Sequence, residues 1–472
     1  MQNWFSHYDE TQVLFLNDLI LGPIAFAIII LFARNRIQYK TDFVYKRYFV
    51  SALAIRLFSS VVIALIYQYY YKAGDTTVYY RYAMKLKDFA GENFSIFFNL
   101  MFSPKFNAFN ADYVFGIGEG YYFENNSARL VIRLATVLCF FLLNSYILVS
   151  FVFSLFCFYG CWKLFKLFYG LYPHLHKEMA LSCLFLPSVC FWGSGLMKDP
   201  LCLGALGLLT YHLYNIVFKN TRIIGRSLIV LLCVLIINEI KVYILLSYFP
   251  PLLLWLFLHA RKTINSVIIR TVVTPALIAF GIIVSILVFS YISKNAKQYE
   301  INSLVRTAKD TQNWLVFSSQ KQGGSFYTLG EIDYSIEGII KVFPKAVNVA
   351  LFRPYLWEAK KPILIPAALE GLISLFFTIR LLYKAGFLRI IRLILLNPEV
   401  QFCLIFSIMF AFSVGFTSFN FGALVRYKIP SLPFYYMALF ILADKEKIIV
   451  PKKVPVKRKN PPQKTILKPQ TA

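Results

Sequence analysis

Acidic residues are few in this chain. Its 472 residues include 23 Asp and Glu against 49 Lys and Arg, which gives a formal net charge of +26. In a soluble protein this excess would suggest a nucleic-acid partner, but the chain is 58% hydrophobic and only 15% charged. About half of the basic residues lie in short connections between apolar stretches or in the C-terminal segment, where anionic lipid head groups attract them. The composition therefore indicates a membrane protein and argues against a nucleic-acid partner.

The chain also lacks a disulfide framework and a ligand set for a metal. Cys157 and Cys161 share a helix face, yet no His or acidic residue stands nearby to complete a metal site. The cysteines all lie in or at the edge of apolar stretches, as small packing residues do: Cys139, Cys157, Cys161, Cys183, Cys190, Cys202, Cys233 and Cys403. The sequence therefore predicts no metal site and does not identify a cofactor. A divalent metal is an open alternative that no residue pattern supports.

Long apolar stretches recur along the chain. A segment of about 20 apolar residues crosses the hydrocarbon core of a bilayer. The predicted spans are residues 12–32, 48–70, 142–162, 179–197, 201–218, 227–237, 243–258, 271–292, 362–382, 401–415 and 431–442. The sequence therefore predicts an all-α, polytopic integral membrane protein with about 11 transmembrane helices.

Basic residues mark every second connection between these spans. Residues 33–47 carry five Lys or Arg against one acid, and the N-terminal leader holds Asp9 and Glu10 without any Lys or Arg. The same basic bias follows the spans that end at residues 162, 218, 258 and 382. Because basic connections face the cytoplasm, we expect a bacterial inner-membrane protein with its N-terminus outside and its C-terminus in the cytoplasm.

One transmembrane domain, residues 1–443, accounts for most of the chain. Two long outer connections, 71–141 and 293–361, are rich in aromatic residues and have no evident core of their own. Such segments favour short helices on the outer membrane face. The expected juxtamembrane helices are residues 79–90, 94–102 and 130–141. The basic segment 444–472, rich in Pro and Lys, is predicted to be disordered.

The first outer connection opens on an acidic residue. Gly74 and Asp75 directly follow a span, and Thr76 and Thr77 come next. A carboxylate fixed at the membrane edge can act as a general base on a substrate whose lipid part lies in the bilayer. Alternatively, Asp75 is an N-cap for the helix that follows.

Further charges follow a stretch with helix-breaking residues. Residues 179–197 contain one proline and two glycines and lead into Lys198, Asp199 and Pro200. If Asp199 begins a helix, Lys198 and the free backbone amides form a corner suited to phosphate. Alternatively, Lys198 and Asp199 are only the polar tip of a hairpin.

Charges also interrupt two apolar runs. Glu239 and Lys241 lie between spans 227–237 and 243–258, where two short spans would meet at a charged tip. The simplest interpretation is a pair whose charges neutralise each other. Arg56, inside the second span, is expected to extend towards the interface or to pair helices.

Two clusters near the end of the chain combine cations with aromatic rings. Arg353 precedes Trp357 and Glu358, and Arg426 precedes Tyr427. Arg presents a rigid fork of donors that suits phosphate oxygens, while Trp and Tyr present faces on which sugar rings stack. All these clusters are predicted to lie on the outer side, so they are candidates for one substrate-binding site.

This arrangement resembles the GT-C superfamily of membrane glycosyltransferases and the bacterial cell-surface polysaccharide proteins related to it. In that superfamily the first large outer loop follows a span, starts near an acidic residue and contains juxtamembrane helices. Asp75 is similar to that residue, and Asp199 is similar to the second acid of the next outer loop. The resemblance extends over about residues 48–382. It departs at Thr76, where a further acid often stands.

The resemblance implies a sugar donor on a polyprenyl phosphate or diphosphate at the outer face, and a glycan, lipid or protein acceptor. Asp75 would then deprotonate the acceptor hydroxyl, and Asp199 and Glu358 would orient the cations or the sugar. The residues implied to hold the departing phosphate are Lys198, Arg353 and Arg426. Two other functions remain open: a polymerase of polysaccharide repeat units, and a flippase of lipid-linked glycans, although the chain has no inverted repeats.

Overall fold

The computed structural model of the chain describes residues 12–104, 106–116, 120–261, 325–330, 332–333 and 335–449. These residues form helices joined by turns, with one isolated β-bridge between Phe326 and Asn420. The all-α prediction is confirmed for them. The predicted span 271–292, residues 293–324 of the second outer connection and residues 450–472 of the basic segment lie outside the described residues.

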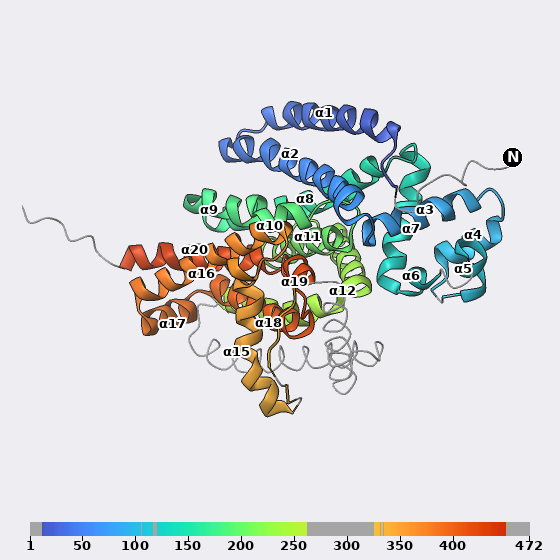
Figure 1. Ribbon diagram of the computed structural model, residues 1–472. Helices are drawn as coiled ribbons and strands as arrows, with labels where there is room; N and C mark the ends of the chain where they lie inside the picture. Colours follow the sequence, from blue (N-terminus) through green and yellow to red (C-terminus); the bar gives the residue numbers. More distant parts are fainter. Residues whose placement is uncertain are drawn as a thin grey trace, which may run out of the picture.

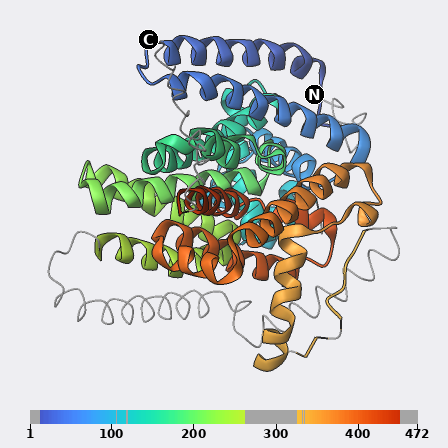
Figure 2. The same ribbon diagram turned by 90° about the vertical axis from the view of Figure 1, so that its left-hand side faces the viewer.

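Seven helices in the described part of the chain are long and apolar enough to cross a membrane. They are α1 (Leu16–Gln38), α2 (Phe43–Leu65) with the π-helical turn Ile66–Tyr71, α8 (Tyr146–Leu171), α11 (Lys198–Lys219), α12 (Ile223–Arg261), α16 (Ile365–Ala385) and α18 (Pro398–Thr417). Large apolar side chains on α1 and α16 point away from the protein, among them Leu19, Ile28 and Phe376. Several long apolar helices with such outward-facing surfaces indicate a multi-pass membrane protein. Figure 2 shows α1 and α2 as a pair along one edge of the bundle.

The predicted span 179–197 is not one continuous helix. The chain forms α9 (His176–Ala180), a π-helical turn (Leu181–Phe185) and α10 (Pro187–Trp192), and then leaves helical geometry before α11 begins. Pro187 has no backbone N–H to continue the preceding helix, which explains the break. The irregular segment lies against other helices, which is the condition for such backbone at membrane depth.

Helix α12 is two antiparallel halves. Its backbone leaves helical geometry at Lys241 (φ −149°, ψ 73°). Lys241 contacts Asp199 in the first turn of α11, while Trp255 stacks on Tyr214 near the other end of α11, with the rings 5.5 Å apart. The second half therefore runs alongside α11 in the same direction, and the first half runs back from the end of α11. As predicted, two apolar segments meet at a charged tip.

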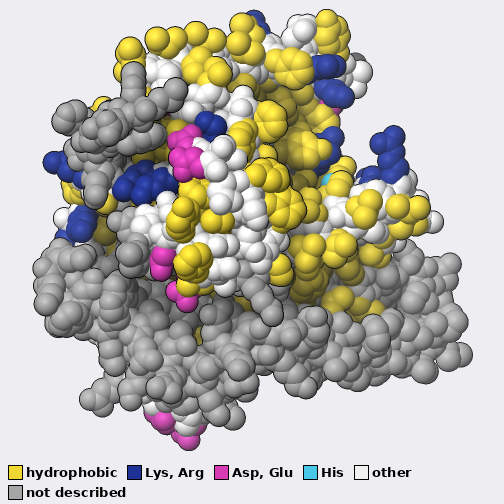
Figure 3. Space-filling model, turned by 90° about the vertical axis from the view of Figure 1, so that its right-hand side faces the viewer, with side chains coloured by type: hydrophobic (Ala, Val, Ile, Leu, Met, Phe, Trp, Pro, Cys, Tyr) yellow, Lys and Arg dark blue, Asp and Glu magenta, His cyan; other side chains and the backbone are white. Residues whose placement is uncertain are grey.

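Short helices gather at one end of the bundle (Figure 1). They are α3 (Asp75–Phe89), α4 (Phe94–Phe102), α5 (Ala108–Phe115), α6 (Tyr121–Glu124) and α7 (Asn126–Phe141). We call this the α3–α7 end. The three juxtamembrane helices predicted in this connection are present as α3, α4 and α7. Viewed from this end, the surface not drawn in grey is mostly hydrophobic or uncharged, with small groups of charged side chains (Figure 3).

The remaining helices complete the second half of the bundle. They are α15 (Ile336–Phe352), α17 (Phe387–Leu396), α19 (Phe421–Tyr427) and α20 (Leu432–Ile449). Helix α20 continues to Ile449, so residues 444–449 are helical and the prediction of disorder from 444 is wrong for these six residues. His174, at the end opposite α3–α7, bonds Asp444 at 2.9 Å and holds this last part of α20.

Glycines let α8 and α11 approach closely. A Cβ atom on Gly160 would lie 2.0 Å from the carbonyl oxygen of Gly204, and one on Gly207 would lie 2.3 Å from that of Gly160. Small residues at such contacts are how helices pack where lipid removes the hydrophobic driving force. This contact fixes the position of the first turn of α11, which carries Asp199.

Candidate functional site

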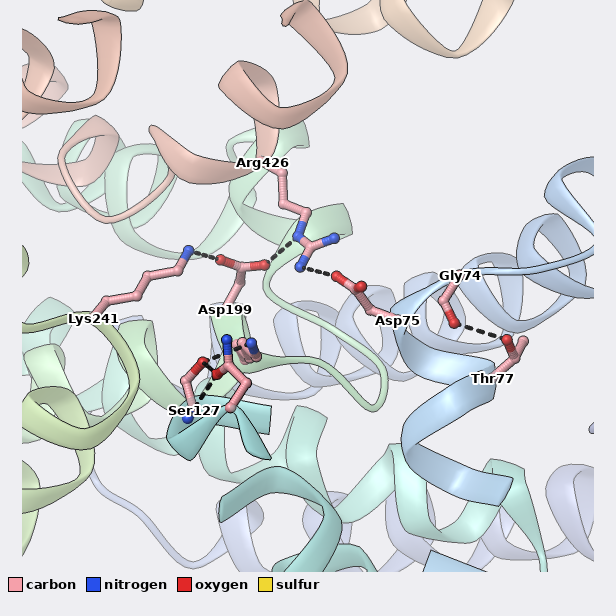
Figure 4. A network of polar contacts seen from close by, with 9 residues as sticks. Gly74, Asp75, Thr77, Ser127, Asp199, Lys241 and Arg426 are labelled. Atoms are coloured by element: carbon pink, nitrogen blue, oxygen red, sulfur yellow. Dashed lines mark hydrogen bonds and ion pairs between the residues drawn. The ribbon is translucent and has the colours of Figure 1, made fainter. Parts of the chain in front are cut away.

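Four charged side chains from distant parts of the chain meet at the α3–α7 end (Figure 4). The members of this charge cluster are Asp75, Asp199, Lys241 and Arg426. Arg426 bridges the two carboxylates: its Nε donates to Asp199 Oδ2 at 2.6 Å and its Nη2 to Asp75 Oδ2 at 2.8 Å. Lys241 Nζ donates to the other oxygen of Asp199. The two carboxylates predicted from the sequence therefore share one arginine.

Asp75 is the first residue of α3 and is held there by Gly74. Gly74 is the N-cap, and its backbone (φ 140°) is in a region that favours glycine. A Cβ at this position would also lie 2.6 Å from the ring of Tyr67. Thr77 donates its hydroxyl proton to the Gly74 carbonyl at 2.8 Å. The alternative that Asp75 is the N-cap is wrong, because its carboxylate instead accepts from Arg426.

The two carboxylates of the cluster differ in access. The Asp75 side chain is 34% exposed and that of Asp199 is 0% exposed. Both oxygens of Asp199 accept from cations, whereas Oδ1 of Asp75 accepts no hydrogen bond from the described residues. Asp75 is thus the carboxylate with an oxygen available to a substrate, and Asp199 serves to hold the two cations.

The turn that leads into Asp199 is fixed by buried polar contacts. Arg56, on α2, donates from Nη1 to the carbonyl of Val189 at 2.6 Å, and the hydroxyl of Ser194 donates to the carbonyl of Arg56 at 3.0 Å. Ser154, on α8, accepts from the N–H of Gly195 at 2.9 Å. The expectation that Arg56 pairs helices is confirmed; it is 1% exposed and does not extend to the interface. These contacts tie the turn before α11 to α2 and α8, so the position of α11 depends on how these helices pack.

Lys241 was not among the predicted site residues. Its ammonium group bonds Asp199 and lies 4.2 Å from the centroid of the Tyr427 ring. The prediction that Lys241 and Glu239 neutralise each other is wrong, because the reversal of α12 at Lys241 turns its side chain towards α11. The sequence signal that could have identified Lys241 as a site residue is its charge inside an otherwise apolar run, since buried charges need a partner.

Arg426 is a fixed cation on α19. Burial alone would lower its pKa, but the carboxylates of Asp199 and Asp75 raise the pKa of Arg426 well above its ordinary value. Its guanidinium carbon lies 5.7 Å from the centroid of the Tyr427 ring, so Tyr427 contacts both cations of the cluster. The guanidinium therefore carries its charge at any pH at which the protein is folded.

Lys198 lies beside the charge cluster and bonds none of its members. Its Nζ donates to the hydroxyl of Ser127, on α7, at 2.7 Å and lies 5.7 Å from the centroid of the Tyr79 ring. The charges of Asp75 and Arg426 both act on Lys198, which places it within electrostatic reach of them. Among the described residues, therefore, no carboxylate bonds Lys198, which is a cation next to the partly exposed Asp75.

Arg353, Trp357 and Glu358 form a separate group. Nε of Arg353 donates to Glu358 Oε2 at 2.9 Å, and a second bond joins Nη2 to the other oxygen. Burial alone would raise the pKa of Glu358, but the hydrogen bonds from Arg353 and from the Tyr355 N–H lower it below its ordinary value. Trp357 is 79% exposed and stacks on Tyr355, with ring centroids 4.9 Å apart. The guanidinium of Arg353 is thus committed to a carboxylate.

This second group is tied to the charge cluster through α19. Lys428, directly after α19, donates from Nζ to the carbonyl of Arg353 at 3.1 Å, and the Arg353 guanidinium lies 5.3 Å from the ring centroid of Phe421. Burial lowers the pKa of Lys428 to about 8, an effect that Glu370 partly offsets. Helix α19 therefore contributes Arg426 to the charge cluster and supports the Arg353 group through its two ends.

The site contains two carboxylates and no further metal ligand among the described residues. Across residues 12–261 and 325–449, as far as the structure describes them, no group of three or more His, Cys, Asp or Glu side chains could hold a metal. Thr76, where the resemblance would place another acid, bonds the hydroxyl of Tyr146 at 2.6 Å. Asp75 and Asp199 instead form ion pairs with the side chains of Arg426 and Lys241.

Comparison with known proteins gives no match. No family model, no curated protein and no solved structure is similar to this chain.

Proposed function

We propose that this protein is a membrane glycosyltransferase that uses a polyprenyl-phosphate- or diphosphate-linked sugar at the outer face of the bacterial inner membrane. It would act in the synthesis of a cell-surface polysaccharide or glycoconjugate. The proposal includes about 11 spans, an N-terminus outside and a cytoplasmic C-terminus. The observation that carries it is the charge cluster, in which a partly exposed carboxylate lies beside cations at one end of a membrane bundle.

Asp75 would be the general base. The acceptor hydroxyl oxygen forms the new bond to the anomeric carbon, the bond from that carbon to the phosphate oxygen breaks, and the hydroxyl proton passes to Asp75. Its free Oδ1 and 34% exposure leave room for this contact. Its other oxygen stays on Arg426, so the carboxylate is oriented before the substrate arrives, which reduces the cost of reaching the transition state.

Cations would stabilise the leaving phosphate, whose negative charge grows as the glycosidic bond breaks. Lys198 bonds no carboxylate in the described part of the chain, and Arg426 has a permanent charge. Fixed cations of this kind are often the largest electrostatic contribution to catalysis. The three cations and two carboxylates at the site sum to one positive charge, which favours an anionic ligand. Asp199 would act only by positioning Arg426 and Lys241.

The Arg353 group would contact the glycan and not the phosphate. Arg353 is neutralised by Glu358, whereas Trp357 presents an exposed aromatic face of the type on which sugars stack. Arg353 would therefore not bind the phosphate, as the resemblance implies. It would instead support the loop that carries Trp357.

The test is Asp75→Asn in purified protein, with lipid-linked donor and acceptor glycan. Asn keeps the size of the side chain and an oxygen that accepts from Arg426, so the melting temperature in detergent should change little. Transfer should fall by about 10²–10⁴-fold, the usual contribution of a general base. The matched control is Asp88→Asn on the same helix, whose side chain is 41% exposed and forms an ion pair with Lys87. This variant should keep full activity.

Undiminished transfer with Asn at position 75 would refute the role of Asp75. No transfer by the unmodified protein, together with movement of the lipid-linked glycan across a vesicle membrane, would refute the enzyme and favour a flippase. Products that grow by whole repeat units would identify a polymerase.

A further inference from the structure

The ammonium group of Lys198 is held by a chain of hydrogen bonds. It donates to Ser127 Oγ at 2.7 Å, and Ser127 Oγ donates in turn to Asn125 Oδ1 at 2.6 Å. Lys198 begins α11, whereas Asn125 and Ser127 lie at the start of α7, and Ser127 belongs to the polar network drawn in Figure 4. Because the hydroxyl proton of Ser127 points to Asn125, a lone pair of its oxygen is left for Lys198. The start of α7 therefore fixes the position of a cation on α11.

Asn125 is itself fixed as the N-cap of α7. Its Oδ1 accepts from the backbone N–H groups of Ser127 at 3.0 Å and Ala128 at 3.3 Å. Capping bonds of this kind stabilise the first turn of a helix. The Ser127 side chain is therefore held in one orientation, by its bond to the cap and by its bond to Lys198.

An aromatic ring also lies near the ammonium group of Lys198. The ammonium nitrogen is 5.7 Å from the centroid of the Tyr79 ring. Tyr79 comes four residues after Asp75 on α3, so the two side chains lie on the same face of that helix. The ring attracts the ammonium group without carrying a formal charge. It thereby helps to hold Lys198 on the side of α3 that carries the Asp75 carboxylate.

Neutral partners do not cancel the charge of Lys198. Arg426 and Lys241 each bond a carboxylate, whereas no ion pair among the described residues includes Lys198. A carboxylate in the place of the Ser127 hydroxyl would hold the ammonium group more tightly, but it would also cancel its charge. A hydroxyl gives the ammonium group a fixed direction and leaves its charge for an anionic ligand.

We propose that Ser127 is a positioning residue, which directs the Lys198 ammonium group at the phosphate of the lipid-linked donor. The inference rests on the proposed function, because that function supplies the phosphate. Ser127 acts through Lys198, and Asn125 acts through Ser127. The side chain at position 127 should therefore decide how tightly a polyprenyl phosphate binds, whether or not a sugar is transferred.

The experiment measures the dissociation constant of farnesyl phosphate for the purified full chain in neutral detergent, with farnesol as the analogue that lacks the phosphate. Ser127→Ala removes the bond to Lys198 and should raise the dissociation constant about 10-fold. Ser127→Thr keeps the hydroxyl and should restore the affinity of the unmodified protein. Neither change should alter the affinity for farnesol.

Ser127→Asp separates positioning from a merely structural role. A carboxylate at this position keeps a bond to Lys198 and suits the first turn of α7, because the N-terminus of a helix favours negative charge. The melting temperature should therefore stay the same or rise. The dissociation constant of farnesyl phosphate should nevertheless increase at least about 10-fold, because the charge of Lys198 is cancelled. The matched control is Thr136→Val on the same helix, whose hydroxyl donates to the carbonyl of Ile132 at 2.8 Å; this variant should bind farnesyl phosphate as tightly as the unmodified protein.

Unchanged affinity for farnesyl phosphate in Ser127→Ala or in Ser127→Asp would overturn the proposal, and so would a Ser127→Thr variant that binds as weakly as Ser127→Ala. The measurement needs no sugar transfer, so it distinguishes this proposal from the proposed function. Binding that depends on residue 127 in a protein that transfers no sugar would support the positioning role towards a lipid phosphate and count against the transferase. Equal binding of farnesyl phosphate and farnesol by the unmodified protein would refute the phosphate site and the role of Ser127 with it.

Discussion

A single substitution should lower the free energy of unfolding most at the Lys241–Asp199 pair. Lys241→Met keeps the length of the side chain and removes the charge that bonds one oxygen of Asp199. Both side chains are buried, at 7% and 0% exposure. Breaking a buried pair by removing one partner costs about 3–5 kcal/mol, because the other charge stays buried without compensation. Since Arg426 still bonds Asp199, we expect the lower part of this range, about 3 kcal/mol.

A double-mutant cycle separates the pair from its surroundings. Asp199→Asn alone leaves Lys241 buried without a carboxylate and should also destabilise the protein strongly. The combination of Lys241→Met with Asp199→Asn leaves no uncompensated charge between the two positions. The double variant should therefore be more stable than the sum of the single changes predicts, by at least about 1 kcal/mol. The measurement is the free energy of unfolding in detergent by denaturant titration.

The control cycle uses a pair with similar chemistry at the surface. Lys87 and Asp88, on α3, are 3.5 Å apart with side chains 20% and 41% exposed. Lys87→Met and Asp88→Asn should be additive within about 0.5 kcal/mol, because exposed ion pairs contribute little. Additivity at Lys241 and Asp199 as well would show that the two charges do not depend on each other, and would refute the arrangement of the charge cluster.

Two further substitutions test the site and the packing below it. Arg426→Lys keeps the charge but loses the planar fork whose Nε and Nη2 bond Asp199 and Asp75, so glycosyl transfer at equal protein level should fall about 10-fold or more; full activity would remove Arg426 from the site. Gly160→Ala places a Cβ 2.0 Å from the Gly204 carbonyl oxygen and should lower stability by about 1–3 kcal/mol, measured by melting in detergent. Gly170→Ala on the same helix has open space around it and should be neutral or slightly stabilising; equal effects at both glycines would contradict the close contact of α8 and α11.

Much of the architecture follows from the sequence because membrane helices are selected by local properties. An apolar run long enough to cross the bilayer must form a helix, since lipid offers no partner to its backbone groups. The spans around α1, α2, α8, α11, α16 and α18 were predictable for this reason, as were α3, α4 and α7 from their amphipathic or apolar character. The segment around Pro187 was harder, because a broken helix and a straight one have similar composition.

The candidate site was predicted in part. Asp75 and Asp199 stood out because each is next to a glycine or proline at the expected start of a helix, and Arg426 because it precedes Tyr427. The structure brings these three together. Lys198 and Tyr427 lie beside them. The sequence could not show that Arg353 is committed to Glu358, because a cation reserved for a ligand and one paired within its own loop look the same in a linear chain.

The sequence by itself determined most of the helical segments and where the charges lie along them. Only the tertiary structure decided the pairing of the charges. Glu239 is two residues from Lys241, yet Lys241 bonds Asp199, 42 residues away, and Asp75 bonds Arg426, 351 residues away. The physical reason is that a buried charge pairs with whichever opposite charge the packed helices bring within reach. Contacts such as that between Gly160 and Gly204 set the positions of the helices. The direction of the Lys241 side chain at the reversal of α12 then decides which charge it bonds.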